Sequence, residues 1–371
     1  MTPIGVGIVG LSTRGGWAAR AHVPALSAVP GLELRAVLGS SPDSTAQTAQ
    51  AFGIAAARSV ADLAARPDID LVVVAVRVPQ HHDVIRAAAD HDVAILSEWP
   101  LAVDRDEAEE LVGVTAGTRT FIGLQGRFGP AVRHVRKMVD DGFVGEILST
   151  SIVASGTQRG PTVAAGSEYL LDRANGATLL TIPFGHLLDT FQPVLGEVTD
   201  IQAVTATRRP EVAVTPDGGN RTMTAEDQVA VVGTLRSGAV TSIHYRGGRP
   251  AGTGFLWEIN GTRGDLRVTA DSGHLQLSPA TVWASQDGTE LAPVTLPDGV
   301  DRFPGLTGQA SHQLAHSYAQ VLADLRSGGT GHPGFAHALR LHDALAAIQA
   351  SSAQGRRIQL KEGTWTPPSP R

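Results

Sequence analysis

Short apolar stretches alternate with alanine-rich amphipathic segments over the first 125 residues. Leu71–Val76 is apolar throughout, as is typical of a strand buried on both faces of a parallel sheet. The alternation predicts βαβ units and a doubly wound parallel sheet. The expected strands are Ile4–Val9, Glu33–Leu38, Leu71–Val76, Ala94–Ser97 and Phe121–Leu124, and the expected helices are Trp17–Ser27, Thr45–Phe52, His82–Ala89 and Asp104–Thr115.

The pattern changes after a helix expected at Pro130–Asp140, because most later segments alternate with period two. Such alternation predicts an α+β domain with a large, mostly antiparallel sheet. The expected strands are Glu146–Val153, Val198–Thr207, Asp227–Leu235, Ala239–Tyr245, Phe255–Gly261 and Gly264–Val268. Helices at Leu179–Leu195 and Gln313–Leu325 are expected to cover one face of this sheet, and Phe335–Ser351 could pack on either domain. We expect domains at 1–125 and 126–362, followed by a loose tail at 363–371.

Composition and charge narrow the range of functions. A chain of 371 residues exceeds one ordinary core, so about two domains are expected. The 30 Lys and Arg residues face 36 Asp and Glu residues without a basic run, which argues against direct nucleic-acid binding. The absence of cysteine excludes disulfides and a thiolate nucleophile. Neither a signal peptide nor a membrane-spanning run is apparent, so we expect a cytoplasmic protein without membrane contact.

A glycine-rich turn follows the first strand, in the segment that runs from Gly7 to Trp17. Gly10 and Gly15 match the first and last glycines of Gly-x-Gly-x-x-Gly, with Ser12 in the middle position. A strand, glycine turn and helix in this order place a diphosphate at the helix N-terminus. We therefore expect a Rossmann domain that binds NAD or NADP. The residues expected at the cofactor are Gly10, Ser12, Thr13, Arg14, Gly15 and Trp17. The alternative is a plain βαβ turn without a ligand.

The end of the second strand reads Leu38-Gly39-Ser40-Ser41, where NAD-specific proteins carry a carboxylate for the ribose 2′-hydroxyl. A small hydroxyl-bearing turn tolerates a 2′-phosphate, which favours NADP slightly over NAD. Arg14 could reach the same region. An equally good interpretation is that Ser40 and Ser41 only cap the helix that begins near Asp43.

The chain resembles the glucose–fructose oxidoreductase/inositol dehydrogenase/MocA family of nicotinamide-dependent oxidoreductases. The motifs that carry the resemblance are the glycine turn, Val78-Pro79-Gln80-His81-His82, Glu98-Trp99-Pro100, Gly123-Leu124-Gln125-Gly126-Arg127-Phe128, Gly142-Phe143-Val144-Gly145-Glu146 and Glu258-Ile259-Asn260-Gly261-Thr262-Arg263-Gly264. The resemblance implies further cofactor residues, which are Val78, His82, Glu98, Trp99 and Gln125. It also implies a cis peptide before Pro100 and a homodimer or homotetramer formed through the C-terminal sheet.

Within this family the chain is most similar to the galactose-regulon repressor branch, a nucleotide-binding regulatory protein without evident enzyme activity. The shared stretches are Gly16-Trp17-Ala18, Glu98-Trp99-Pro100, Leu124-Gln125-Gly126-Arg127 and Leu180-Thr181-Ile182-Pro183-Phe184-Gly185-His186. The family usually has Glu-Lys-Pro and an Asp-x-x-x-His helix motif. Here Trp99 replaces the lysine, and Thr181 or Ile182 falls near the aspartate position.

Few residues could replace the missing proton-transfer groups, because Lys137 and Lys361 are the only lysines. His186 is the first candidate for a general acid or base, since imidazole titrates near a pKa of about 6.5. It could instead be a core histidine bonded to a backbone carbonyl. Tyr169 is a second catalytic candidate, whereas Tyr245 is expected to be structural.

Trp99 has two interpretations. Its indole could form a flat apolar wall beside the nicotinamide and the substrate, or it could fill the space of the absent lysine. His81, His82, His312 and His316 lack a metal-ligand spacing with carboxylates, so no metal is expected.

These features predict an oxidoreductase that transfers hydride between NAD(P) and a small carbonyl, imine or sugar-like substrate. Two alternatives remain open: a non-catalytic NAD(P)-binding sensor that engages a protein partner, and a nucleotide-dependent enzyme with a redox-neutral reaction. Substrate-contacting loops are expected at Ser155–Ser167 and Arg246–Gly254, whose conformation the sequence does not determine.

Overall fold

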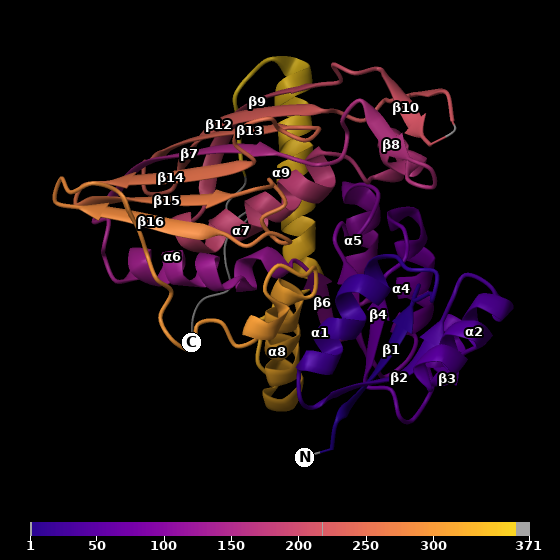
Figure 1. Ribbon diagram of the computed structural model, residues 1–371. Helices are drawn as coiled ribbons and strands as arrows, with labels where there is room; N and C mark the ends of the chain where they lie inside the picture. Colours follow the sequence, from indigo (N-terminus) through magenta and orange to yellow (C-terminus); the bar gives the residue numbers. More distant parts are fainter. Residues whose placement is uncertain (1, 217, 361–371) are drawn as a thin grey trace. The chain divides into compact units, whose positions relative to one another are not determined.

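The computed structural model describes residues 2–216 and 218–360, so Lys361 and the expected tail at 363–371 lie outside the described residues. The described chain forms two compact units (Figure 1). Unit 1 contains residues 2–125 and 303–339, and unit 2 contains residues 126–302 and 340–360. The first division between the units follows Gln125. The last boundary falls inside helix α9 (Phe335–Gln354), which contributes to both units.

Unit 1 is built on a parallel six-stranded sheet in the order β3-β2-β1-β4-β5-β6. This is the strand order of a Rossmann fold, and the order reverses between β1 and β4. All four residues of the β4 strand are buried, as its apolar sequence predicts. The strands are β1 (Ile4–Val9), β2 (Leu32–Leu38), β3 (Ala55–Ala56), β4 (Leu71–Val74), β5 (Ala94–Glu98) and β6 (Thr120–Gly123).

The helices of unit 1 cover this sheet and include one from the C-terminal third of the chain. They are η1 (Ala18–His22), α1 (Val23–Ala28), α2 (Pro42–Phe52), α3 (Val60–Ala64), η2 (Val78–Gln80), α4 (His81–Ala89), α5 (Arg105–Val114), η7 (Pro304–Leu306) and α8 (His312–Ser327). The expectation that α8 covers the second domain's sheet is wrong. Leu314, Tyr318 and Val321 form an apolar stripe that packs in the unit 1 core with Ala21 and Ala25, whose small side chains allow close approach.

Unit 2 contains a nine-stranded sheet in the order β17-β16-β15-β14-β7-β13-β12-β9-β18. Within this sheet, β7 and β13 are the only described neighbours that pair in parallel, which confirms the mostly antiparallel sheet. The strands are β7 (Ile147–Ser155), β9 (Val198–Ala206), β12 (Gln228–Leu235), β13 (Val240–Arg246), β14 (Phe255–Gly261), β15 (Gly264–Ala270), β16 (Thr281–Gln286), β17 (Ala292–Pro293) and β18 (Ile358–Gln359). The short strands at both edges were not expected from the sequence.

A small second sheet in unit 2 was also not expected. It has the order β11-β10-β8, with strands β8 (Thr162–Ala164), β10 (Glu211–Thr215) and β11 (Asn220–Thr222). These strands are too short for a periodic signal, and a separate cluster of Leu171, Val212, Met223 and Ala225 packs beside them. The helices of this unit are η3 (Gln125–Phe128), α6 (Pro130–Asp140), η4 (Glu168–Leu171), η5 (Arg173–Asn175), η6 (Leu180–Phe184), α7 (Gly185–Leu195) and most of α9.

The two faces of the large sheet differ in exposure. Helices α6 and α7 lie on one face (Figure 1), where alternate residues such as Ile243, Tyr245 and Trp257 are buried. The opposite face exposes Val204 and Val232, which are 64% and 51% accessible. Apolar side chains of this size on an open sheet face are typical of an association surface. None of the helices within the described ranges is long and apolar enough to cross a bilayer.

Candidate functional site

The glycine turn after β1 has the geometry that a diphosphate requires. Gly10 has φ of 101°, and a Cβ atom there would lie 2.5 Å from the Ala75 carbonyl oxygen at the end of β4. Its amide donates to the Leu38 carbonyl at the end of β2, at 2.8 Å. The backbone can approach this closely only without a side chain. Gly10 therefore lies where the strand order reverses, which is the usual nucleotide position in open α/β sheets.

The remainder of the turn is open. Gly15 and Gly16 have φ near 100°, and no described atom lies within 4 Å of the position of a Cβ at either residue. Thr13 and Arg14 are exposed, and the Ser12 hydroxyl accepts the Arg14 amide at 3.2 Å. The turn leads directly into η1 and α1, whose N-terminus carries unpaired amides and a partial positive charge. This arrangement fits a bound diphosphate.

Two buried polar atoms that follow strands of the same sheet support a ligand in this unit. The indole Nε1 of Trp17, at the N-terminus of η1, has no hydrogen-bond partner among the described residues. The amide oxygen of Gln125, which is 1% exposed, also lacks a partner in that part of the chain. Buried polar atoms without partners are uncommon in folded proteins unless a ligand or water completes them. Both residues belong to the expected cofactor set.

Ser40 and Ser41 occupy the turn after β2. The Ser41 hydroxyl accepts the Ser44 amide at 3.2 Å and caps α2, so the capping interpretation is confirmed for Ser41. Ser40 is exposed. No carboxylate follows β2 before Asp43, which lies in the first turn of α2. The slight preference for NADP stays a prediction.

Glu98 ends β5 beside a buried histidine. The Nε2 atom of His22 lies 3.1 Å from Glu98 Oε1, the separation of an ion pair, although the two atoms are not aligned as a hydrogen bond. The Nδ1 atom of His22 lies 2.6 Å from the Tyr318 hydroxyl of α8. Burial, and secondly the Glu98 charge, raise the pKa of Tyr318 well above its ordinary value. The hydroxyl therefore keeps its proton and can donate it to Nδ1.

His22 ends η1, a single turn of π-helix. The Val23 amide donates to the Ala18 carbonyl, five residues earlier, and Pro24 has no amide hydrogen with which to continue the normal ladder. A π-turn inserts one extra residue and rotates the side chains that follow it, and such turns are frequent at functional sites. Here it coincides with the histidine that lies against Glu98.

Trp99 and Pro100 form the loop after β5. The peptide bond between them is cis, as the resemblance implies, and Trp99 is 4% exposed. His81 holds this loop, because its Nδ1 lies 2.9 Å from the Pro100 carbonyl and its Nε2 lies 3.2 Å from the Val76 carbonyl. Burial lowers the pKa of His81, so the ring is neutral at neutral pH. Because His81 and His82 are adjacent in the chain, this structural role of His81 could not be distinguished by sequence from a role of His82.

His82 faces α5. Its ring nitrogens lie 3.1 Å from the Asp83 carboxylate and 3.2 Å from that of Glu110. Hydrogen bonding to Asp83, and then to Glu110, raises the pKa of His82. Val78 is buried at the start of η2. The cofactor roles expected for His82 and Val78 stay predictions.

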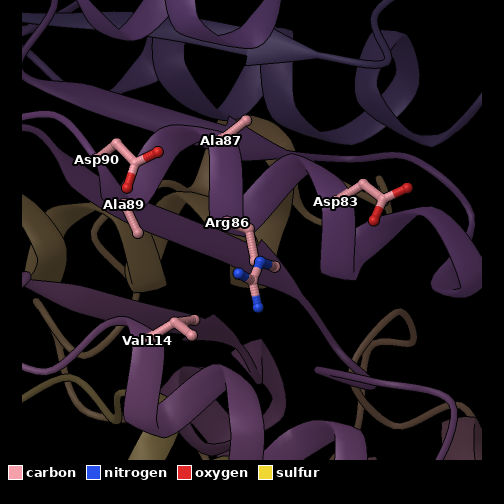
Figure 2. A pocket seen from close by; sticks show the side chains of 6 residues that line it. All are labelled: Asp83, Arg86, Ala87, Ala89, Asp90 and Val114. Atoms are coloured by element: carbon pink, nitrogen blue, oxygen red, sulfur yellow. The ribbon is translucent and has the colours of Figure 1, made fainter.

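A hollow of about 500 Å³ lies at α4 and the C-terminal end of α5 (Figure 2). Its lining residues are Asp83, Arg86, Ala87, Ala89, Asp90 and Val114. Figure 2 shows the Arg86 side chain extending from α4 on the side where Val114 lies. The Arg86 guanidinium is already paired with Glu110 at 2.5 Å. None of the candidate cofactor or catalytic residues lines this hollow, so it offers no chemistry for the reaction.

His186 lies in the first turn of α7 in unit 2 and is 5% exposed. It directly follows η6, a second π-turn, in which the Phe184 amide donates to the Leu179 carbonyl and Pro183 interrupts the ladder. His22 therefore ends one proline-linked π-turn, and His186 comes directly after another. Tyr169, the other catalytic candidate, lies half-buried in η4.

A group of buried polar side chains that the sequence did not single out lies near His186. Arg159, Tyr245 and His274 are 3%, 0% and 8% exposed. The charges of Arg159 and His186 lower the pKa of His274, in addition to the larger effect of burial. Arg159 lies in the first of the two loops expected to contact substrate, and Tyr245 lies in β13 directly before the second. The Gly248 amide joins these loops by donating to the Gln158 carbonyl at 2.8 Å.

The start of unit 2 is fixed to α7 by a buried ion pair. Arg127 donates from Nε to Asp189 Oδ2 at 2.8 Å and from a terminal nitrogen to Oδ1, and both side chains are buried. Such a two-point contact sets the orientation of the partner as well as its distance. Asp189 is one turn along α7 from His186, so the pair orients the helix segment that carries the candidate acid.

Comparison with known proteins agrees with this geometry. Residues 4–125 match the model of the "Oxidoreductase family, NAD-binding Rossmann fold". The dehydrogenase aclE of Aspergillus oryzae is 30% identical over 269 residues, which cover 70% of this chain and 73% of that protein. The chain belongs to the Gfo/Idh/MocA oxidoreductase family. The NAD-binding fold of the first 125 residues is thereby shown.

The second half of this Gfo/Idh/MocA protein is similar to a regulator. Residues 130–270 match the model "Gal80p, C-terminal domain". The galactose/lactose metabolism regulatory protein GAL80 of Kluyveromyces lactis is 30% identical over 300 residues, covering 74% of this chain and 66% of that protein. A crystal structure of a super-repressor mutant of Gal80p from Saccharomyces cerevisiae has a TM-score of 0.86 at 25% identity, covering 97% of this chain and 98% of that one. The expected similarity to the repressor branch is confirmed.

Proposed function

We propose that this protein is a NAD(P)-dependent oxidoreductase that reduces or forms a carbonyl or imine on a small, sugar-like substrate. The observation that carries the proposal is the turn at Gly10, which excludes any side chain where the strand order reverses. The two buried atoms without partners, Trp17 Nε1 after β1 and Gln125 Oε1 after β6, support a ligand at the carboxyl ends of the strands of the same sheet. When bound, the nicotinamide supplies or accepts a hydride.

In this proposal His186 supplies the proton that completes reduction, or removes it during oxidation. A carbonyl that gains a hydride needs one proton to become an alcohol, and an imidazole can transfer it at neutral pH. Trp99 carries no proton-transfer group, so the usual lysine has no replacement at its own position. Trp99, held by His81, instead provides an apolar wall that excludes water. Tyr169 is the second candidate for proton transfer.

The replacement of the family's usual lysine by Trp99 favours reduction of an activated double bond. Oxidation of an alcohol requires a base to remove the hydroxyl proton as hydride leaves, whereas a protonated imine needs no further proton when it accepts hydride. We therefore expect imines and activated carbonyls to be better substrates than simple alcohols.

Calorimetry with NADH and NADPH tests cofactor binding first. The Gly10→Ala variant should lose at least about 100-fold in affinity for both nucleotides, because its Cβ would displace the Ala75 carbonyl and the turn. Gly53→Ala is the matched control, since Gly53 also has positive φ but open space around it, at the end of α2. Failure of the wild type to bind either nucleotide would end the proposal.

Turnover is tested by following NADPH absorbance with a panel of carbonyls, imines and sugars. The His186→Gln variant should bind nucleotide normally and lose about 100-fold or more in rate, the usual contribution of a general acid. His91→Gln is the control, because His91 is partly exposed in the turn between α4 and β5 and belongs to no candidate site. If the wild type consumes nucleotide and His186→Gln does so equally fast, His186 is not the acid.

A second candidate function is a non-catalytic NAD(P) sensor that engages a protein partner. The match of residues 130–270 to the Gal80p C-terminal domain and the Glu98-Trp99-Pro100 sequence favour it. Nucleotide that binds to the wild type but is never consumed by any compound of the panel would favour this function. A redox-neutral reaction would instead convert substrate without net change of the nucleotide.

We also infer that the protein forms a homodimer or homotetramer through the outer face of the nine-stranded sheet. Val204 of β9 and Val232 of β12 lie on neighbouring strands, and both side chains are exposed on that face. Burying such a surface removes apolar area from water and favours association. Light scattering on the purified protein gives the number of subunits directly.

A further inference from the structure

The buried group at the end of the large sheet in unit 2 combines one cation with two other polar side chains. Arg159 follows β7, Tyr245 lies near the end of β13, and His274 follows β15. A Cβ atom on Gly156 would lie 3.5 Å from His274 Nε2 and 3.6 Å from Tyr245 Cε1, so a glycine lies directly against both rings. The Arg159 charge acts on both side chains. We call Arg159, Tyr245 and His274 the Arg159 cluster.

Arg159 is held in a conformation that its surroundings must impose. Its φ is 58°, in the left-handed region that residues with a Cβ rarely adopt. Gly247 packs against it so closely that a Cβ there would lie 2.5 Å from the Arg159 carbonyl oxygen. Strained backbone of this kind persists where the surrounding structure fixes it, and it is concentrated at ligand sites.

The guanidinium of Arg159 is only partly satisfied. One terminal nitrogen donates to Gln158 Oε1 at 3.2 Å and the other donates to the Ala177 carbonyl, whereas Nε is buried and has no partner in the described chain. Both of these acceptors are neutral, and among the described residues no carboxylate pairs with Arg159. Burial lowers the pKa of Arg159 to about 10, so it remains a cation at neutral pH.

Glu226 is the nearest source of negative charge, but its carboxylate is already engaged. Oε1 accepts the Leu180 amide at 2.9 Å and the Thr178 hydroxyl, so it caps the start of η6. Oε2 lies 3.9 Å from Arg173. Glu226 therefore moderates the potential at Arg159 without supplying it with a hydrogen-bond acceptor.

Tyr245 adds a second donor without an acceptor. Its hydroxyl is buried and has no partner within the described ranges. Gly273 leaves room for it, because a Cβ at that position would lie 2.6 Å from the hydroxyl oxygen. Burial raises the pKa of Tyr245 against the opposing effect of the Arg159 charge, so the hydroxyl keeps its proton. His274 is neutral, since burial and the charges of Arg159 and His186 lower its pKa to about 3.

We propose that the Arg159 cluster binds a carboxylate group of the substrate, with Arg159 Nε and the Tyr245 hydroxyl as donors. A carboxylate supplies one negative charge and acceptor oxygens for both donors, which a neutral hydroxyl cannot do. A phosphate dianion would be poorly matched, because one cation near Glu226 would face two negative charges. This inference deepens the proposed function, on which it rests for the identity of the site, by naming the substrate as a sugar acid or related hydroxy acid.

The test uses pairs of probes that differ only at one carbon. The full-length protein is titrated by calorimetry with D-galacturonate against D-galactose, D-glucuronate against D-glucose, and glycerate against glycerol. At least one acid should bind about tenfold or more tightly than its neutral partner, the difference that a charge-assisted hydrogen bond produces. D-Galactose 6-phosphate serves as the dianionic comparison and should bind more weakly than the preferred acid.

Two variants connect the preference to the cluster. Tyr245→Phe removes only a hydroxyl without a partner, so it should fold with an unchanged melting temperature and lose most of the preference for the acid. Arg159→Gln should abolish the preference, but it also removes the bond to Ala177 and could reduce folding yield. Tyr318→Phe is the matched control, because it removes a hydroxyl of unit 1 that bonds to His22. It should leave the preference unchanged.

The outcomes separate this inference from the proposed function. Equal binding of acid and neutral partner in all pairs, no binding of any acid, or an unchanged preference in both cluster variants would overturn the carboxylate site. If D-galactose 6-phosphate bound more tightly than every acid, the cluster would be a site for a dianion and the proposed carboxylate site would be wrong. Nucleotide binding and consumption are measured separately, so an acid that binds without any turnover retains the site and rejects the oxidoreductase.

Discussion

Two buried clusters in this protein contain similar side chains but differ in how their polar atoms are paired with one another. In unit 1, His22 bonds to the Tyr318 hydroxyl and lies at ion-pair distance from Glu98. In unit 2, Arg159 and Tyr245 are equally buried, yet Arg159 Nε and the Tyr245 hydroxyl have no acceptor in the described chain. In the first cluster the two atoms without a hydrogen-bond partner, His22 Nε2 and Glu98 Oε1, lie 3.1 Å from each other. In the second cluster no acceptor of the described chain bonds to either donor.

The difference indicates which cluster maintains the fold and which serves a ligand. A buried donor without an acceptor is unfavourable by about 1–3 kcal/mol, so the folded state gains little from keeping one unless a ligand completes it. A cluster whose side chains interact with one another, such as His22 with Tyr318 and Glu98, contributes to stability in the absence of any ligand. The comparison therefore predicts that changes in unit 1 affect stability first, and that changes in the Arg159 cluster affect binding first.

The largest expected effect comes from His22→Ala. The substitution leaves a cavity in the unit 1 core and deprives the buried Tyr318 hydroxyl of its acceptor, which together should destabilise the protein by about 3 kcal/mol. Urea unfolding followed by circular dichroism measures this change. His91→Ala, at a partly exposed turn between α4 and β5, should change stability by less than about 0.5 kcal/mol. Equal values for the two variants would show that the unit 1 cluster contributes nothing to the fold.

The next effect concerns the response of the Arg159 cluster to acid. Because the folded protein holds the pKa of His274 near 3 and the unfolded chain titrates near 6.5, the unfolded state binds a proton first as the pH falls. Below pH 6.5, stability should therefore fall by about 1.4 kcal/mol per pH unit from this residue. Unfolding at pH 7.5 and pH 5 should differ more in the wild type than in His274→Gln. Identical pH dependence would contradict the burial of a neutral His274.

The smallest effect gives the sharpest contrast between the clusters. Tyr318→Phe removes a hydroxyl that bonds to His22 at 2.6 Å and should destabilise the protein by about 1–2 kcal/mol. Tyr245→Phe removes a hydroxyl without a partner and should leave stability unchanged or slightly higher in the absence of ligand. Differential scanning calorimetry on both variants measures this difference. Destabilisation by Tyr245→Phe alone would reverse the assignment of the two clusters.

Local chemistry explains why much of unit 1 could be predicted from the sequence. The Gly10 turn, the apolar β4 strand and helix α4 follow from backbone freedom, strand burial and periodicity, which act over a few neighbouring residues. The cis peptide before Pro100 and the similarity to the repressor branch were likewise recognised from short motifs. The cofactor residues expected from those motifs include Trp17 and Gln125, whose buried atoms without partners agree with that role.

Long-range packing decided the remainder. The position of α8 in unit 1 depends on small residues of α1 that are about 300 positions away in the chain, so helical periodicity alone could not assign it. The Arg159 cluster joins two loops and the end of β13, and nothing in the pattern around Arg159, Tyr245 or His274 reveals that these buried side chains act on one another. Periodicity and motifs in the sequence determined the helices, the strands and the nucleotide turn, because these features depend on residues that are close together in the chain. Only the tertiary structure determined which buried polar groups find partners, because that depends on residues brought together from distant parts of the sequence.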